Sequence, residues 1–317
     1  MNTLPATGCL GIDVGGTKTH GVLLDGQGRR LRESVRPTRP GPEGVIATIV
    51  EVVSDCVGRE AEDLDPLMVG VGIPGQVDHR RGIVRTAVNL GISELDLGAQ
   101  LSSAFGTRVR VDNDVKAAAL GAAHFLGEGD GDLAYINFGT GVSAAAIVRG
   151  RLCRGEGNIA GEIGHFPVDP HAERCQCGQR GCIEVLAGGG RIAARLADLG
   201  PDLTLLNLAR SADAGNLRAI AEADRVSTGI ALAVQLMVIA HGSALVALGG
   251  GVVHVAPGLV ARAKRLLDAR AAHSPFLASL HLSERVTIVP VEYPVAVYGA
   301  ALAGLDDSHA PESVLVG

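Results

Sequence analysis

The sequence GIDVGGTKTHGVLLDG, residues 11–26, decides the fold. An apolar run, Leu10 to Val14, is interrupted by Asp13 and leads through two glycines into a second apolar run, Gly21 to Leu24. This order predicts two strands joined by a glycine turn. The sequence INFGTGVSAAAIVRG, residues 136–150, repeats the order 124 residues later, so that Ile136 matches Ile12. Two halves that open with the same hairpin indicate duplicated domains, because a solenoid would have a far shorter period.

Strands alternate with helices along the rest of the chain, which predicts an α/β fold. Apolar residues at helical spacing predict helices over 42–57, 117–125, 191–199, 217–241 and 296–305. Short apolar runs predict buried strands over 67–73, 109–111, 245–248 and 286–289.

The first glycine turn has the side chains expected at a phosphate-binding site. Uncovered backbone N–H groups at Gly15 and Gly16 lie next to the hydroxyl of Thr17, the ammonium of Lys18 and the carboxylate of Asp13. We therefore expect a phosphate cradle with a place for Mg²⁺, although the spacing is not that of a Walker A loop. A plain hairpin turn would explain the glycines but not an aspartate inside an apolar strand.

The second turn, Gly139, Thr140 and Gly141, repeats the cradle with Asn137 in place of the aspartate. Taken alone it is as consistent with a common turn as with a ligand loop, and its match to the first turn favours the ligand loop. Two such turns could hold the phosphate chain of one nucleotide. A third glycine run, which includes Gly250 and Gly251, follows a buried strand where a ligand could approach the backbone.

Three cysteines and a histidine lie close together between residues 160 and 184. His165 is followed by Cys175, Cys177 and Cys182, and thiolate and imidazole are the ligands that Zn²⁺ prefers. Disulfides or ordinary buried thiols are the alternatives, but a Cys-x-Cys pair bridges poorly and three cysteines leave one sulfur over. The pattern therefore favours a structural zinc site, and reduced cysteines favour the cytoplasm.

The acidic pair in Asp112-Asn113-Asp114 follows a short strand, where ligands gather in α/β sheets. One of the two aspartates could cap the helix that follows, which leaves the other carboxylate surplus. Such a carboxylate near a substrate hydroxyl could take its proton during phosphoryl transfer. Capping and catalysis are equally consistent with these three residues.

The composition excludes several classes of protein. A net charge of −6 without a basic run argues against a nucleic-acid-binding protein. The first nine residues have neither a basic residue nor an apolar core, so we expect no signal peptide, and the longest apolar stretch, 229–240, is too short to span a bilayer. With few aromatic residues and 44 glycines, the core must consist of small and branched aliphatic side chains.

Together, these motifs resemble the ROK family of sugar kinases and regulators within the actin-like ATPase superfamily. The resemblance runs in the family's order over nearly the whole chain. It rests on residues 11–18, 72–75, 112–114, 139–141, 161–165, 175–184 and 248–251. It implies two ribonuclease-H-like α/β domains that face a central cleft. We expect a first domain over residues 1–115, joined by the C-terminal helix 296–305, and a larger domain over 116–295 that contains the zinc site.

The resemblance also implies the activity, which is ATP-dependent phosphorylation of a hexose, usually at the 6-hydroxyl, in a homodimer. It implies Asp114 as the base that takes the sugar hydroxyl's proton. The two glycine turns would bind the phosphates of ATP, with Mg²⁺, and Gly250 and Gly251 the nucleoside. The positions that match sugar-binding residues are Gly75, Asn113, Asp114, Glu162, His165 and Glu184, with His165 also a zinc ligand.

The chain departs from the family pattern near the sugar, because it contains no tryptophan. Glucose is the expected substrate, and an N-acetylhexosamine, mannose or an amino sugar remains open. A sugar-responsive regulator is a second hypothesis, but the first strand begins by Leu10 and leaves no room for a DNA-binding domain. A third, an ATP-dependent protein of the actin or chaperone kind, would have no use for Glu162, His165 and Glu184. We expect no nucleic-acid or membrane partner.

Overall fold

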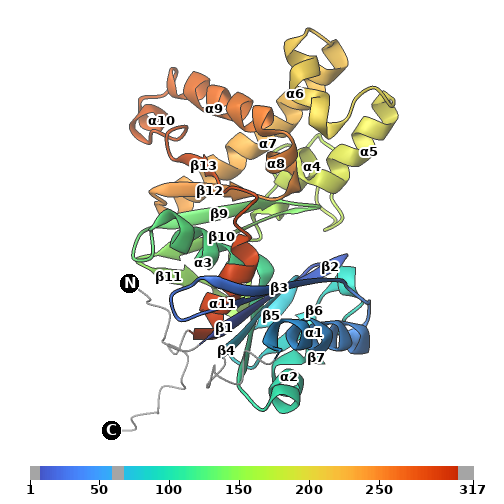
Figure 1. The fold of residues 1–317 in the computed structure, drawn as a ribbon. Coiled ribbons are helices and arrows are strands. Elements are labelled where there is room, and N and C mark those ends of the chain that lie inside the picture. The colour runs from blue at the N-terminus through green and yellow to red at the C-terminus, as the bar shows by residue number, and fades with distance from the viewer. Residues whose placement is uncertain (1–7, 59–67, 306–317) are drawn as a thin grey trace. The chain divides into compact units, whose positions relative to one another are not determined.

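The computed structural model describes residues 8–58 and 68–305, and the chain divides into two compact units (Figure 1). The first unit contains the chain up to Gly129, the short segment 154–159 and the chain from Pro294 onward. The second contains residues 130–153 and 160–293. The strand predicted over residues 67–73 begins at residue 67, which lies outside the described residues.

The first unit is built on a five-stranded sheet of order β3-β2-β1-β4-β8. β1 pairs antiparallel with β2 and parallel with β4, and β4 pairs parallel with β8. The helices of this unit are α1 (Pro42–Val57), α2 (Leu97–Phe105), α3 (Asp114–Leu126) and α11 (Val295–Leu305). Its sheet strands are β1 (Cys9–Val14), β2 (Lys18–Leu24), β3 (Arg30–Pro37), β4 (Met68–Ile73) and β8 (Val109–Asn113). A small antiparallel sheet contains β5 (Gln76–Asp78), β6 (Ile83–Thr86) and β7 (Leu95–Asp96), next to the 3-10 turn η2 (Val88–Leu90).

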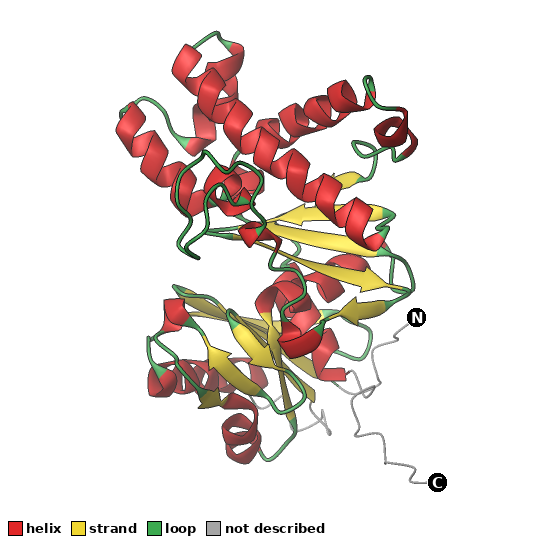
Figure 2. Ribbon diagram, turned by 180° about the vertical axis from the view of Figure 1, so that it is seen from behind, coloured by secondary structure: helices red, strands yellow, loops and turns green. Residues whose placement is uncertain are grey.

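The second unit repeats this architecture with strand order β11-β10-β9-β12-β13 (Figure 2, yellow). Its strands are β9 (Leu133–Phe138), β10 (Val142–Val148), β11 (Arg151–Cys153), β12 (Leu245–Gly249) and β13 (Val286–Ile288). Its longer helices are α5 (Gly189–Leu199), α6 (Leu205–Asp213), α7 (Leu217–His241) and α9 (Pro257–Ala271). Its short helices are α4 (Ile183–Ala187), α8 (Gly251–Val255), α10 (Pro275–Ser279) and the 3-10 turn η4 (Ile163–His165), while η3 (Glu156–Asn158) belongs to the first unit.

The repeat predicted from the sequence is confirmed, because β9 and β10 have the bounds of β1 and β2 plus 124 residues. The registers differ by one residue. Val14 pairs with Thr19 across the first turn, whereas Phe138 pairs with Val142 across the second, which is one residue shorter. The α/β class predicted from the alternation of strands and helices is also confirmed.

Alternation along β1 sorts its side chains onto two faces of the first sheet. Leu10, Ile12 and Val14 join the apolar cluster that contains α1, whereas Cys9 packs with α11. Asp13 therefore lies on the same face as Cys9, the one that α11 covers. The core on both faces is aliphatic, as the composition predicts.

Helix α11 reaches the first unit's backbone directly, because glycines remove the side chains in between. A Cβ placed on Gly11 of β1 or Gly70 of β4 would overlap the carbonyl oxygens of Val297 and Ala300. A Cβ on Gly299 would overlap the carbonyl oxygen of Ala117 in α3. Glycine is required at these positions by close approach.

Helix α3 begins at Asp114, three residues before the predicted start, and packs along α11. The boundary expected between residues 115 and 116 therefore falls in the first turn of a helix that the first unit keeps whole. Helices α2, α6 and α9 were not predicted from the sequence, although the buried residues of α9, Leu259, Val260, Ala263 and Leu267, have helical spacing.

Helix α7 is long and apolar enough, by length and composition alone, to cross a bilayer. It contributes a run of fully buried side chains to the core of the second unit, among them Ile230, Val234 and Met237. A buried core helix passes the same test of length and composition, so α7 gives little support to a membrane span.

Replacing Gly299 by alanine is expected to lower the unfolding midpoint, because the new methyl group must displace the α3 backbone. Overpacking of this kind costs about 3 kcal/mol, or a drop of roughly 5–10 °C. Differential scanning calorimetry of Gly299→Ala would measure it. Gly129→Ala is the control, because a Cβ there meets nothing within 4 Å. Equal unfolding midpoints for the two variants would contradict this, because they would show that α11 can shift away from α3 to make room for the methyl group.

Candidate active site

The first glycine turn is exposed at its tip and closed at its base. The N–H of Gly15 donates to the carbonyl of Lys18 at 2.9 Å, while Gly16, Thr17 and Lys18 are exposed. The next residue, Thr19, is fully buried and exchanges a hydroxyl hydrogen bond with Thr38 at 2.9 Å. The turn is thus anchored from below and presents N–H groups, a hydroxyl and an ammonium to a ligand.

Asp13 lies at the end of β1 in a row that crosses three parallel strands. It is in register with Gly72 of β4, and Gly72 is in register with Asp112 of β8. Burial raises the pKa of Asp13 to about 7, the negative charge of Asp114 adds to the rise, and Lys18 opposes it. The middle position has no side chain, since a Cβ on Gly72 would lie 3.4 Å from the Cα of Asp114.

Asn113, and neither aspartate, caps α3. Its side-chain oxygen accepts hydrogen bonds from the N–H groups of Val115 at 3.0 Å and Lys116 at 3.2 Å. The expectation that an aspartate caps this helix is therefore wrong: Asp114 is the first helical residue and Asp112 lies inside the strand. The amide of Asn113 also donates to the carbonyl of Gly75 at 3.1 Å, which joins two positions of the predicted sugar site.

The second glycine turn is held from several sides within its own unit. The carbonyls of Gly139 and Thr140 accept from Gly189 and Gly190 at 2.8 and 2.9 Å. Gly250 has a φ of 92° and lies against the backbone of Phe138, so a side chain there is excluded. The structure thus brings the turn and Gly250 together, and Gly251 follows as the first residue of α8.

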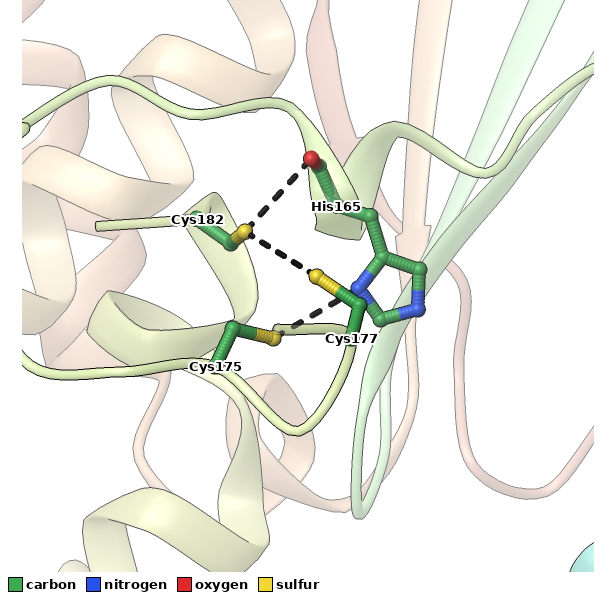
Figure 3. Close-up of side chains that lie close together, drawn as sticks. All are labelled: His165, Cys175, Cys177 and Cys182. Atoms are coloured by element: carbon green, nitrogen blue, oxygen red, sulfur yellow. Dashed lines mark hydrogen bonds between the residues drawn. The ribbon is translucent and has the colours of Figure 1, made fainter. Parts of the chain in front are cut away.

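The predicted zinc ligands form one compact group (Figure 3). The ligand atoms of His165, Cys175, Cys177 and Cys182 all lie within 4.8 Å of one another. The Sγ atoms of Cys177 and Cys182 are 3.7 Å apart, and Sγ of Cys175 is 3.6 Å from Nδ1 of His165. Tetrahedral zinc with usual bond lengths requires edges of about 3.8 Å between sulfurs and about 3.6 Å between sulfur and nitrogen. The four residues fit such an ion.

The thiols differ in how readily they ionise. Hydrogen bonds from the backbone and side chain of Gln179 lower the pKa of Cys177 to about 6, whereas burial raises that of Cys182 to about 12. A divalent cation would reverse the second effect, since a coordinating thiol loses its proton. Gln179 also donates to the carbonyl of His165 at 2.9 Å, which ties the cysteine loop to the histidine segment.

The remaining predicted sugar residues cluster around the start of β10. Glu184 accepts a hydrogen bond from the N–H of Val142 at 3.1 Å. The segment that contains Glu162 and His165 lies against the same strand, because the carbonyl of Gly161 accepts from Ala144 at 2.8 Å. Glu184 thus connects the second glycine turn with the cysteine cluster, where its other oxygen is 4.0 Å from Sγ of Cys175.

Sequence reasoning missed Arg154, Lys116 and Asn158 in the first unit. Arg154 and Asn158 contact Asp112, and Lys116 donates to the carbonyl of Asn158. The available signal was the surplus carboxylate of Asp112, since a buried carboxylate requires a cation. The sequence could not indicate which of its many arginines supplies that charge.

Comparison with known proteins identifies the family. The ROK family profile matches residues 9–285. A glucokinase of Thermotoga maritima is 30% identical over 269 residues, which cover 78% of this chain and 83% of the relative. The crystal structure of a ROK hexokinase from Thermus thermophilus is 29% identical with a TM-score of 0.76, covering 94% of this chain and 97% of that one. A ROK family glucokinase from Streptomyces griseus, solved with glucose and AMPPNP, is 25% identical with a TM-score of 0.73, covering 93% and 98%.

The fold is therefore that of the ROK sugar kinases in the actin-like ATPase superfamily. The chain belongs to the ROK family, which confirms the resemblance drawn from its motifs.

The cysteine cluster predicts that the purified protein contains about one zinc ion per chain. We expect Cys182→Ser to lose the metal and unfold at a lower temperature, because Sγ of Cys182 is one of the four ligand atoms and bound metal stabilises the folded state. Cys153→Ser, outside the cluster, should keep both. Elemental analysis and thermal unfolding of the two variants would measure this, and full zinc in Cys182→Ser would contradict the assignment.

The raised pKa of Asp13 predicts a stability that depends on pH. Its folded value of about 7 exceeds the reference value of 3.8, so stability is fully present below about pH 4 and is lost as pH rises through 7. Asp13→Asn removes the charge and should unfold at a higher temperature than the wild type at pH 8, with a smaller difference at pH 5. Each kcal/mol corresponds to about 2–4 °C. If the difference in unfolding temperature between Asp13→Asn and the wild type does not grow from pH 5 to pH 8, the ionised carboxylate of Asp13 does not destabilise the fold.

Proposed function

We propose that the chain is an ATP-dependent hexose kinase that phosphorylates a sugar hydroxyl, the 6-hydroxyl of glucose, with Asp114 as the general base. The observation that carries the proposal is the placement of Asp114. It is the first residue of a helix and follows an asparagine that caps the helix and donates to the carbonyl of Gly75, at the carboxyl ends of the parallel strands β1, β4 and β8. Membership in the ROK family and similarity to glucokinases support it.

Asp114 would accept the proton of the attacking hydroxyl as the phosphoryl group is transferred. Asn113, Gly75, Glu162, His165 and Glu184, which match the family's sugar-binding positions, would hold the other hydroxyls. Carboxylates suit this role because they accept hydroxyl hydrogens in charge-assisted hydrogen bonds. The N–H of Val142 already fixes one oxygen of Glu184, so this carboxylate meets a sugar in a set orientation.

The two glycine turns would bind the phosphates of ATP. The first presents Gly15, Gly16, Thr17 and Lys18 with Asp13 at its base, and the second presents Gly139, Thr140 and Gly141. Mg²⁺, when bound with ATP, would neutralise the phosphate charge. Gly250, whose backbone lies against Phe138, and Gly251 would leave room for the nucleoside.

The Cys/His cluster would position sugar-binding residues and take no part in the chemistry. Nδ1 of His165 points toward the cysteines and its other ring nitrogen points away from them (Figure 3). A ligand bound through Nδ1 keeps its proton on Nε2, which is then a fixed donor to a sugar hydroxyl. We further propose that the protein acts in the cytoplasm, where its six free cysteines stay reduced, and that it forms a homodimer.

A coupled assay of ADP release with glucose, mannose, glucosamine and N-acetylhexosamines tests the proposal. We expect turnover that requires a sugar and is fastest with glucose, and a loss of kcat of about 10²–10⁴ in Asp114→Asn, because the amide cannot take a proton. The matched control is Asp130→Asn, which changes the same kind of group outside the predicted site. ATP hydrolysis independent of every sugar, or full activity in Asp114→Asn, would contradict the proposal.

A further inference from the structure

Two buried charges flank Asp114 at equal distances along the chain. Asp112, two residues before it, is 3% exposed, and Lys116, two residues after it, is 2% exposed. A charge that is removed from water is costly unless a partner of opposite sign or several hydrogen bonds compensate. The elements on both sides of Asp114 are therefore held by whatever satisfies these charges.

Both charged side chains contact one short segment, Arg154 to Asn158. A guanidinium nitrogen of Arg154 lies 2.7 Å from Oδ2 of Asp112, and the ammonium of Lys116 donates to the carbonyl of Asn158 at 2.9 Å. The side-chain amide of Asn158 donates to the carbonyl of Val77 at 2.9 Å and reaches Oδ1 of Asp112 at 3.5 Å. The segment thus contacts the chain before and after Asp114 and the strand that follows Gly75.

This segment belongs to the first unit, although the chain on both sides of it belongs to the second. The polypeptide leaves the first unit after Gly129, forms three strands of the second unit, and returns for residues 154–159 before it enters the second unit again. Asn158 adopts a φ of 64°, a left-handed conformation that asparagine adopts more readily than most residues with a Cβ. Both its carbonyl and its side-chain amide make hydrogen bonds.

The buried contacts of Arg154 and Asn158 are not those that would give the folded protein its greatest stability. Nε of Arg154 and Oδ1 of Asn158 are buried without a hydrogen-bond partner among the described residues. A buried ion pair is also often no more stable than well-packed apolar side chains of the same size. The ion pair and the hydrogen bond of Lys116 connect the end of β8 and the first turn of α3 to one segment.

We propose that Arg154 and Asn158 are positioning residues for phosphoryl transfer, which clamp the chain on both sides of Asp114 and so set the place of its carboxylate. The inference rests on the proposed function for the role of Asp114. A proton acceptor displaced by about 1 Å can lose about 100-fold in rate. The clamp therefore acts on kcat through Asp114 without touching the sugar or ATP.

The kinetic test uses Arg154→Met, which keeps the length of the side chain but removes its charge. We expect kcat to fall about 100-fold while KM for sugar and ATP changes less than about threefold, and Arg154→Lys to recover part of the loss. Asn158→Gly keeps the backbone conformation and the carbonyl for Lys116, and should lose about 10-fold. Arg151→Met, an exposed arginine of β11, is the control and should match the wild type.

A double variant separates positioning from stability. Arg154→Met with Asp112→Asn removes both charges of the Arg154–Asp112 pair, so that neither is left buried without the other, and its unfolding midpoint should return toward the wild type. Its kcat should stay low, because the link to the segment is still absent. Recovery of kcat together with the midpoint, or a kcat within twofold of wild type in Arg154→Met, would overturn the proposal.

Hydrogen–deuterium exchange tests the clamp without requiring turnover. Amide exchange in residues 112–118 should be faster in Arg154→Met than in the wild type, while the rest of α3 is unchanged. Unchanged exchange in residues 112–118 would overturn the clamp even if the protein is a kinase. Absence of sugar-dependent turnover in the wild type, with faster exchange in Arg154→Met, would overturn the proposed function and leave the clamp in place.

Discussion

Direct backbone contact between α11 and the elements of the first unit is the constraint on which that unit depends. α11 forms near the end of the described chain, yet it packs against β1 and β4 through Gly11 and Gly70 and against α3 through Gly299. Because carbonyl oxygens lie where side chains would stand, these elements cannot shift independently. β1 ends in the first glycine turn and α3 begins at Asp114. The positions of both parts of the proposed site thus follow from a helix that contains no site residue.

Charge is concentrated at the carboxyl edge of the same sheet at a cost to stability. Asp13 and Asp112 stand on the same face on either side of Gly72, and Asp114 begins the next helix. The raised pKa of Asp13 measures the unfavourable part, and the ion pair of Asp112 with Arg154 offsets another part. Stability alone would not retain three carboxylates here. The proposed function would explain them, because a site for phosphoryl transfer would need carboxylates for a cation and for accepting a proton.

The sequence was sufficient wherever the signal was local. Periodicity predicted α1 and α7 to the residue, and the internal repeat predicted both hairpins because the same turn chemistry recurs at a fixed offset. Cysteine and histidine spacing predicted a cluster that the structure shows to be compact. The one-residue difference in register between the hairpins was not predictable, since it depends on how each turn closes. The partner of Asp112 lies 42 residues away along the chain, and no local pattern indicates such a contact.

The two hairpins also show how one backbone arrangement supports two chemistries. Asp13 in the first and Asn137 in the second occupy equivalent positions, and each is in parallel register with a glycine, Gly72 or Gly249. In the first unit the carboxylate remains close to Lys18 and Asp114 and contributes charge. In the second, the amide is neutral and its oxygen lies beside Gly250, where the backbone comes closest. The same hairpin therefore places a carboxylate at the first turn, and at the second a neutral amide next to a closely approaching backbone.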